Sequence, residues 1–198
     1  MENLLQKFIR VKAVAAPLPL ANIDTDMIIP ARYMKALTRS GLGRHLFREL
    51  RFDEDGGERA GFILNQPACR AAQILVADRN FGCGSSREHA VWALADFGIR
   101  CVIAPSFGDI FSGNARKNGL LLIRLPEALC ARLREEIALA QYAPVEVDLA
   151  AQHIRLASGE TIGFDIDPDD RRILMEGLDD IARTLRHADA IARFEAAL

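Results

Sequence analysis

The chain has 198 residues, of which 50% are hydrophobic and 26% are charged, a composition typical of one globular domain with a substantial core. The 25 Lys and Arg residues nearly balance the 27 Asp and Glu residues, so the net charge of -2 gives no electrostatic footprint for nucleic acid or for an anionic membrane. No stretch is apolar enough for a bilayer span and residues 1–10 form no signal-peptide core, so we expect a cytoplasmic protein.

The first third of the chain predicts one strand followed by a long surface section. Apolar and basic residues alternate from Phe8 to Ala16, as in a half-buried strand that Pro17 and Pro19 end. The segment Asn22 to Pro30 begins with turn-forming side chains and ends with apolar ones. Many charges lie between Arg39 and Gly61, where we expect loops and short helices.

The middle of the chain has the strongest pattern, that of a βαβ unit. The predicted elements are a strand at Ile74–Ala77, a helix at Glu88–Phe97, a strand at Cys101–Ala104 and a strand at Leu120–Ile123. A βαβ unit pairs its strands in parallel, with a right-handed crossover. Ser106 and Asp109 resemble a capping box before a short helix that reaches Lys117.

The last third predicts helices around a small antiparallel sheet. A helix is expected after Pro126, which fits the first helical position. Alternation with period two predicts strands at Val145–Leu149, His153–Leu156 and Thr161–Ile166, and the tail is helical with a break near Gly177. We therefore predict one α/β domain over residues 1–198, a partly parallel sheet flanked by helices, with a helical C-terminal extension from about residue 168.

The cysteines and histidines are too scattered to predict a metal site. They are Cys69, Cys83, Cys101, Cys130, His45, His89, His153 and His187. No C-x-x-C pair exists, so the sequence predicts no zinc or iron-sulfur site built from local ligands. Cys101 and Cys130 lie in apolar stretches typical of buried thiols, whereas Cys83 lies in a glycine-rich loop.

The segment from Asn80 to His89 is the first candidate site. It follows a predicted strand and precedes a predicted helix, which is where open α/β sheets place ligands. Gly82 and Gly84 allow the backbone to turn sharply, and the helix N-terminus favours a carboxylate or phosphate. Because Arg87 adds a fork that matches a carboxylate, the segment predicts a site for a small organic anion.

Ser85 and Ser86 of this segment are placed to hydrogen-bond the same anion, but an alternative remains open. Ser85 and Glu88 also have the spacing of a capping box, which serves only to satisfy free helix N–H groups. Arg87 occupies the position at which a dinucleotide-binding fingerprint needs its third glycine and a nucleophile elbow needs its last glycine. No phosphate loop is present, so the sequence supports neither a nucleotide site nor a nucleophile elbow.

The second candidate site is the acidic segment formed by Asp24, Thr25 and Asp26. In an extended chain the two acids project to one side and Thr25 to the other, so the acids are able to pair with Arg or His from elsewhere. An acidic turn before a strand is the alternative. We expect His89, on the following helix, to hold its neighbours in place and Trp92 to belong to the core.

Five stretches of the sequence together resemble the small subunits of 3-isopropylmalate dehydratases, a family of the aconitase superfamily. They are Asn22–Pro30, Thr38–Phe47, Asn80–Ala90, Ile103–Phe107 and Gly177–Asp179. The Gly-Ser-Ser-Arg-Glu-His run is shared with the mobile domain of the aconitases. The separate short chain and the Thr38–Phe47 stretch point to the bacterial leucine-pathway family.

The resemblance implies a swivelling β/β/α domain of the aconitase C-terminal type. This domain would close over a large subunit that carries a [4Fe-4S] cluster, so that this chain itself binds no cofactor and no metal. The family acts as a hydro-lyase in leucine biosynthesis, converting 2-isopropylmalate and 3-isopropylmalate through 2-isopropylmaleate. The expected partners are the large subunit, in a heterodimer or larger assembly, and a dicarboxylic hydroxy acid, without nucleic acid or membrane.

The resemblance also implies roles for individual residues. Ser85 would be the catalytic base, which takes a proton from the carbon next to a carboxylate, and Ser86 and Arg87 would hold a substrate carboxylate. The loop from Arg32 to Phe47 would distinguish substrates, with isopropyl contacts from Tyr33, Met34 and Leu37. Supporting or interface roles fall to Asp24, Thr25, Asp26, Gly82, Gly84, Glu88 and His89. Cys83 replaces the acid of the aconitases, as in the isopropylmalate branch.

Two other functions fit the same residues. One is the small subunit of a paralogous hydro-lyase that acts on homoaconitate, citraconate or dimethylmaleate. The other is a non-catalytic module that binds an anion without a partner. Comparing turnover of these acids separates the paralogous hydro-lyase from the expected enzyme. Dicarboxylate binding without turnover identifies the non-catalytic module.

Overall fold

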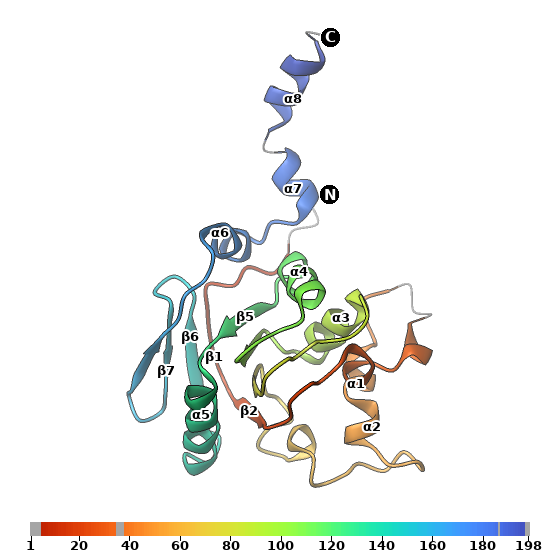
Figure 1. Ribbon diagram of the computed structural model, residues 1–198, viewed down its shortest axis with the longest axis vertical. Coiled ribbons are helices and arrows are strands. Elements are labelled where there is room, and N and C mark those ends of the chain that lie inside the picture. The colour runs from red at the N-terminus through yellow and green to blue at the C-terminus, as the bar shows by residue number, and fades with distance from the viewer. Residues whose placement is uncertain (1–4, 35–37, 186, 197–198) are drawn as a thin grey trace.

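The computed structural model describes residues 5–34, 38–185 and 187–196, and it contains one parallel sheet, one antiparallel sheet and several helices (Figure 1). The parallel sheet has the strand order β2-β3-β4-β5. Its strands are β2 (Ala15–Leu18), β3 (Ile74–Ala77), β4 (Cys101–Ala104) and β5 (Leu121–Arg124). Every residue of β3 and β4 is buried, as expected for parallel strands covered on both faces. The predicted βαβ unit is confirmed, and β2 adds a fourth strand.

The antiparallel sheet has the strand order β1-β6-β7-β8. Its strands are β1 (Arg10–Ala13), β6 (Val145–Asp148), β7 (His153–Arg155) and β8 (Thr161–Gly163). The three predicted C-terminal strands are therefore confirmed. The single strand predicted at Phe8–Ala16 was wrong, because the chain crosses from one sheet to the other at Val14. Pro17 lies inside β2 rather than ending it, since an edge strand does not need every N–H for pairing.

Helices cover both faces of the parallel sheet. Their bounds are α1 (Thr25–Ile28), α2 (Arg48–Arg51), α3 (Glu88–Phe97), α4 (Asp109–Lys117), α5 (Glu127–Leu139), α6 (Pro168–Glu176), α7 (Asp180–Leu185) and α8 (Ala188–Glu195). Short 3-10 turns lie at Ala31–Tyr33, Gly43–His45 and Ile63–Asn65. None of the helices described is long and apolar enough to cross a membrane.

The hydrophobic core has two parts, one on each face of the parallel sheet. Leu75 and Val102 face the part that contains residues of α1, α3 and α4. Ile74 and Ile103 face the other part, which contains residues of α5 and of the antiparallel sheet. This alternation of side chains along the strands produces the β/β/α layering that the resemblance implies.

Two predicted helix starts differ from the structure. The α5 helix begins at Glu127, with Pro126 at the N-cap rather than at the first helical position. The capping box at Ser106 was wrong, because the N-cap of α4 is Gly108 and makes no side-chain cap bond. Instead, the Oγ of Ser106 accepts a hydrogen bond of 2.8 Å from the backbone N–H of Asn80. The helix prediction did not anticipate this link to the candidate site.

The helical tail predicted from about residue 168 is confirmed. Asp167 caps α6, and Gly177 ends it in the left-handed conformation, with a φ of 68°. The helices α7 and α8 then extend away from the two sheets (Figure 1). Ile181 and Phe194 on these helices are 70% and 67% exposed. The tail therefore presents apolar side chains to solvent.

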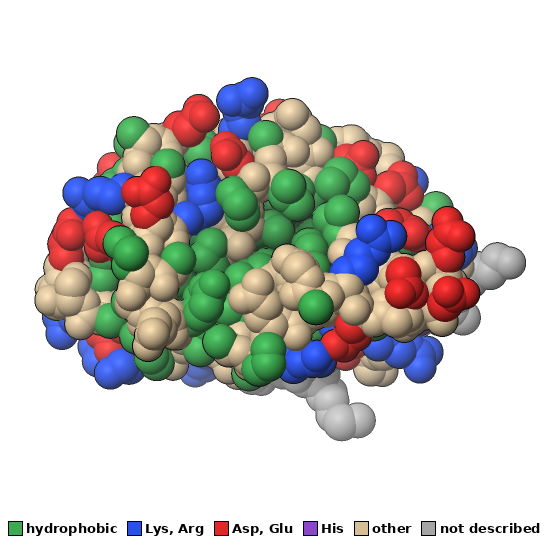
Figure 2. All heavy atoms as spheres, turned by 90° about the horizontal axis from the view of Figure 1, so that it is seen from below, with side chains coloured by type: hydrophobic (Ala, Val, Ile, Leu, Met, Phe, Trp, Pro, Cys, Tyr) green, Lys and Arg blue, Asp and Glu red, His purple; other side chains and the backbone are tan. Residues whose placement is uncertain are grey.

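The opposite end of the molecule also has an apolar surface. Figure 2 shows hydrophobic side chains gathered across the middle of this face, with Lys, Arg, Asp and Glu around them. A hollow of about 290 Å³ lies beside the C-terminal end of α5, and its lining includes Ile137 and Val145. Leu139, which also lines this hollow, is 83% exposed. Apolar surface is thus exposed at both ends of the molecule.

Candidate functional site

The turn from Asn80 to Arg87, here called the site turn, connects β3 to α3 at the carboxyl edge of the parallel sheet. The segments that follow β2 and β4 hold it from both sides. On one side, Gly82 N–H donates to Ile23 O at 2.7 Å and Thr25 N–H donates to Cys83 O at 3.0 Å. On the other, Phe81 N–H donates to Ser106 O at 3.0 Å and Gly108 N–H donates to Phe81 O at 2.9 Å. Backbone bonds to two neighbouring loops therefore fix the position of the turn.

Gly82 occupies a place in the site turn where a side chain has no room. Its φ is 73°, and a Cβ atom added there would lie 2.2 Å from Cγ of Phe111. The ring of Phe111 also contacts the ring of Phe81, with 5.4 Å between centroids. On the neighbouring loop, a Cβ atom at Gly108 would lie 2.5 Å from the carbonyl oxygen of Gly82. The turn thus lies directly on α4, with glycine at both points of closest approach.

Replacing Gly82 by alanine should lower the free energy of unfolding by about 2–4 kcal/mol, because strain from the positive φ adds to a clash with Phe111. The matched control is Gly113→Ala within α4, where a Cβ atom meets no other atom within 4 Å. Alanine there should stabilise the protein by about 0.5–1 kcal/mol, since glycine is a poor helix former. Chemical denaturation of both variants measures the difference, and a Gly82→Ala loss below about 1 kcal/mol contradicts the expectation.

Ser85 lies in the exposed part of the site turn, together with Gly84 and Ser86. Its carbonyl oxygen accepts a hydrogen bond of 3.1 Å from the hydroxyl of Thr25, and the two hydroxyl oxygens are 3.4 Å apart. Thr25 is only 2% exposed. The serine hydroxyl therefore lies beside a buried hydroxyl group, just before the N-terminus of α3.

The capping-box alternative for Ser85 and Glu88 is wrong. The N-cap of α3 is Arg87, which makes no side-chain cap bond. Glu88 instead accepts a hydrogen bond of 2.8 Å from the side-chain amide of Asn118, at the end of α4. Ser85 precedes the N-cap by two positions, so it is too far back along the chain to act as the helix cap.

Arg87 forms an ion pair with Asp26 across the site. Nη1 of Arg87 contacts Oδ1 of Asp26, which also accepts a hydrogen bond of 3.2 Å from Ala31 N–H. The Arg87 side chain is 15% exposed and that of Asp26 is 53% exposed. The hydrogen bond from Arg87 lowers the pKa of Asp26 below its usual value, against a smaller opposing effect of burial. Asp26 therefore remains ionised and holds the guanidinium beside the site turn.

The extended conformation predicted for the acidic segment was wrong. Thr25 begins the short helix α1, and Asp24 is its N-cap, accepting a hydrogen bond of 2.7 Å from Met27 N–H. Successive helical residues rotate by about 100°, so the two acids do not share a side. The predicted pairing with an arginine is found for Asp26 alone, while Asp24 satisfies a helix N–H group.

Behind the site turn, polar and aromatic side chains tie α3 to the end of α4. The rings of His89 and Trp92 lie 4.6 Å apart, and Trp92 is half-buried against the core. The indole N–H of Trp92 donates to Asn118 at 3.0 Å, and Asn118 donates to Glu88. His89 thus contacts Trp92, and its role in holding neighbours in place stays a prediction. Sequence reasoning missed Asn118, since a single amide after a helix forms no recognisable pattern.

The residues predicted to distinguish substrates lie on a separate loop. The ring of Tyr33 stacks on that of His45, with 3.8 Å between centroids, while Met34 is 37% exposed. Leu37 lies outside the described residues. A hollow of about 330 Å³ in this loop is lined by Arg32, Tyr33, Thr38, Ser40, Gly41, Leu42, Arg44 and His45. Burial and neighbouring arginines lower the pKa of His45, which favours its neutral form at pH 7.

The cysteines do not form a ligand set for a metal or an iron-sulfur cluster in the described part of the chain. No group of three or more His, Cys, Asp and Glu side chains is arranged there to hold a metal ion. Cys69, Cys101 and Cys130 are buried, and burial raises the pKa of the first and third thiols to about 11. Buried thiols with a raised pKa disfavour the thiolate that a cluster requires.

Models of known protein families match residues 5–128, 131–168 and 180–197 of this chain. Residues 5–128 match the Aconitase C-terminal domain, and residues 180–197 match the C-terminal domain of the 3-isopropylmalate dehydratase small subunit. The 3-isopropylmalate dehydratase small subunit of Paramagnetospirillum magneticum is 53% identical over 191 residues, which cover 96% of this chain and 95% of that protein. The protein of the same name from Gluconacetobacter diazotrophicus is 55% identical over 192 residues, covering 97% and 93%.

A solved structure has the same fold. The crystal structure of 3-isopropylmalate dehydratase from Methanocaldococcus jannaschii is 28% identical in sequence and superposes with a TM-score of 0.69. The superposition covers 93% of this chain and 99% of that one. The layered arrangement described above is therefore shared with a protein of that name.

Proposed function

This chain belongs to the family of 3-isopropylmalate dehydratase small subunits, and we propose that it acts with a large subunit as a hydro-lyase in leucine biosynthesis. The pair would isomerise 2-isopropylmalate and 3-isopropylmalate by dehydration to 2-isopropylmaleate and rehydration in the other sense. The 53–55% identity over nearly the full length of the relatives supports this activity. The proposal includes a cytoplasmic location, in keeping with four free cysteines.

The observation that carries the proposal is the exposed hydroxyl of Ser85 beside Thr25 and a helix N-terminus. Dehydration removes a proton from one carbon, and the electrons of that C–H bond form the double bond as hydroxide leaves the next carbon. We assign the proton transfer to Ser85, which would return the proton during rehydration. The same hydroxyl thus serves both directions of the isomerisation.

A serine alkoxide needs strong stabilisation, and three neighbouring groups supply it. The N-terminus of α3 places positive potential near Ser85, and the guanidinium of Arg87, which Asp26 partly neutralises, adds to it. The hydroxyl of Thr25 donates to the Ser85 carbonyl and lies 3.4 Å from the Ser85 hydroxyl, so a small rotation would allow it to donate to the alkoxide. We therefore assign Thr25 a positioning role.

The same arrangement suggests how a substrate carboxylate binds. Arg87 offers a planar fork, which the ion pair with Asp26 holds in place, and Ser86 lies next to it in the turn. Gly84, Ser85 and Ser86 are exposed, so water surrounds the hydroxyl of Ser85 in this chain by itself. Exclusion of that water requires a second surface, which we assign to the large subunit.

Two further features of the proposal do not belong to the site turn. The [4Fe-4S] cluster is assigned to the large subunit, because the described cysteines do not form a ligand set. Contacts to the isopropyl group are assigned to Tyr33, Met34 and Leu37 on the strength of the resemblance. Arg32 and Tyr33 line the hollow of that loop, which supports a role in substrate choice for the loop as a whole.

The direct test is turnover of 3-isopropylmalate by the chain alone and after anaerobic mixing with its large subunit. We expect activity only in the mixture, followed by the absorbance of the unsaturated intermediate. Turnover by the chain alone would contradict the assignment of part of the active site to the large subunit. Activity of the mixture only on homoaconitate, citraconate or dimethylmaleate indicates a paralogous enzyme, and dicarboxylate binding without any complex indicates a separate binding module.

A further inference from the structure

A hollow of about 390 Å³ lies where α4 and β5 meet the segment that leads into α6. Its lining residues are Ser112, Arg116, Leu120, Leu122, Arg124, Asp165, Ile166, Asp167, Asp170 and Leu174. The hollow is separate from the site turn and from the loop of Tyr33, since its lining contains no residue of either among those described. Its volume is at the small end of the range for ligand pockets, which favours a ligand of few atoms.

Four aliphatic side chains form the apolar part of this hollow. Leu120 and Leu174 are 2% and 4% exposed, and Leu122 and Ile166 are half-buried. Leu120 directly precedes β5 and Leu122 lies in it, Leu174 lies in α6, and Ile166 lies in the link before α6. A short branched aliphatic group would displace water from the exposed parts of Leu122 and Ile166 and gain hydrophobic contact with them.

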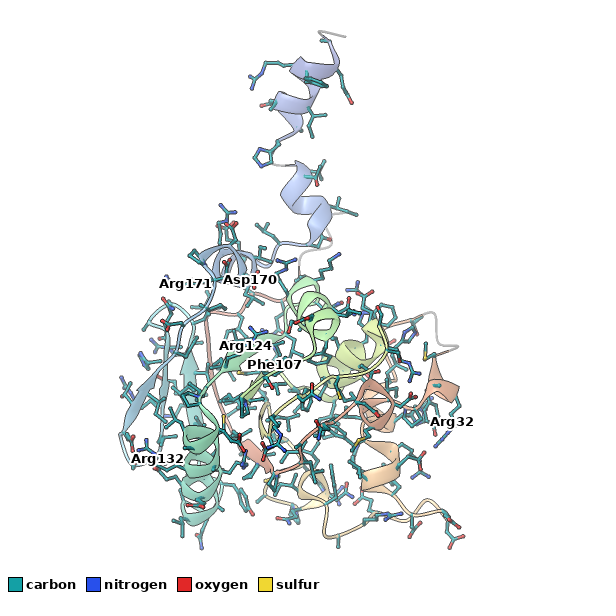
Figure 3. The ribbon with its side chains drawn as sticks, viewed as in Figure 1. Arg32, Phe107, Arg124, Arg132, Asp170 and Arg171 are labelled. Carbon is teal, nitrogen blue, oxygen red and sulfur yellow. The ribbon has the colours of Figure 1, made fainter. Side chains whose placement is uncertain are left out.

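Arg124 supplies a positive charge that no carboxylate neutralises. Its Nη2 donates to the hydroxyl of Ser112 at 3.2 Å, and its guanidinium carbon lies 5.5 Å from the ring centroid of Phe107. Figure 3 shows Arg124 beside Phe107 at the end of β5, with Asp170 on the neighbouring helix. Among the residues that the structure describes, no carboxylate lies within ion-pair distance of Arg124. The guanidinium is therefore oriented and still free to bind an anion.

The acids of the hollow differ in whether they already have partners. Asp170 pairs with Arg116 at 3.1 Å, and Asp167 caps α6 by accepting hydrogen bonds from two backbone N–H groups. Asp165 is exposed, and no hydrogen bond or ion pair joins it to any described residue. The hollow thus combines one free cation and one free anion with an apolar lining.

We propose that this hollow binds a free α-amino acid with a branched aliphatic side chain. The carboxylate of the ligand would pair with Arg124, its ammonium group with Asp165, and its side chain would contact Leu122 and Ile166. A simple carboxylic acid leaves Asp165 unpaired, and a simple amine leaves Arg124 unpaired, so both charges of the zwitterion are needed for tight binding. This proposal does not depend on the proposed enzymatic activity.

The test is calorimetric titration of the full-length chain with L-leucine at neutral pH. We expect saturable binding at one site per chain, with a dissociation constant of about 1 mM or lower. Two ligands of the same shape serve as controls, 4-methylpentanoate without the ammonium group and 3-methylbutylamine without the carboxylate. Each should bind at least about tenfold more weakly, because each leaves one charge of the hollow without a partner.

Variants of the two free charges identify the site. Arg124→Gln and Asp165→Asn should each weaken L-leucine binding about tenfold or more, with unchanged circular dichroism. Arg132→Gln, which removes an exposed ion pair with Glu160 outside the hollow, should leave binding unchanged. The proposal is overturned by an absence of saturable binding, by equal binding of 4-methylpentanoate, or by full binding in both hollow variants.

Discussion

Replacing Ser85 by alanine should lower kcat of the assembled enzyme for 3-isopropylmalate by about 10²- to 10⁴-fold, the contribution expected of a lost general base. The substitution removes the hydroxyl that lies 3.4 Å from the hydroxyl of Thr25. The backbone bonds that fix the site turn involve neighbouring residues, and the bond that Ser85 accepts reaches its carbonyl oxygen. Assembly with the large subunit and the value of KM should therefore change little.

Two further serine variants show whether the loss is specific to Ser85. Ser86→Ala should act mainly on KM, because we assign Ser86 to carboxylate binding. Ser158→Ala, at an exposed position between β7 and β8, should leave both kinetic constants unchanged. If Ser85→Ala retains kcat within about tenfold of the wild-type enzyme, another group must be the base.

Replacing Arg87 by lysine should lower kcat/KM by about 100-fold, although the positive charge is retained. Lysine lacks the planar fork, so it is unable to bind a carboxylate through two parallel hydrogen bonds while also pairing with Asp26. Charge-assisted hydrogen bonds of this kind contribute about 1.5–3 kcal/mol each, which is consistent with a loss of this size. Steady-state kinetics of the anaerobic mixture measures the effect, with Arg132→Lys as the control at an exposed arginine.

A second measurement separates the loss of the fork from the loss of the charge. In the wild-type protein Arg87 lowers the pKa of Asp26, so this pair stabilises the fold above the ordinary carboxyl pKa, and the stabilisation is lost as pH falls through the lowered pKa. Arg87→Met should raise the pKa of Asp26 towards its ordinary value, as followed by carboxyl NMR. Wild-type turnover in Arg87→Lys, or an unchanged pKa in Arg87→Met, contradicts the assignment.

Local sequence patterns were sufficient to predict most of the parallel layer. The strands β3 and β4 are short uninterrupted apolar runs, and α3 combines an apolar face with Gly98, which ends the helix in the left-handed conformation. Because these signals lie within a few residues of each other, no knowledge of the rest of the chain was needed. The position of the site turn at the edge of the sheet followed from the same βαβ unit.

Features that depend on contacts distant in the chain were not predictable in this way. Apolar alternation continues past Val14, so nothing local marks the point at which the chain changes sheets. The fit of Phe111 against Gly82 joins positions 29 residues apart, and either residue alone has several ordinary explanations. The roles assigned to Ser85, Ser86 and Arg87 rest on the resemblance together with the local geometry, and they stay predictions.

The N-terminal segment and the helical tail leave the body of the protein at the same corner (Figure 1). Leu5 N–H donates to Gly177 O at 3.0 Å, and a Cβ atom at Gly177 would lie 2.4 Å from Leu5 O. The helical tail therefore starts beside Leu5, and α7 and α8 then carry the chain away from that corner (Figure 1). A tether to the large subunit joined after α8 would therefore start beyond this tail, and its length would set the effective concentration that replaces a bimolecular encounter.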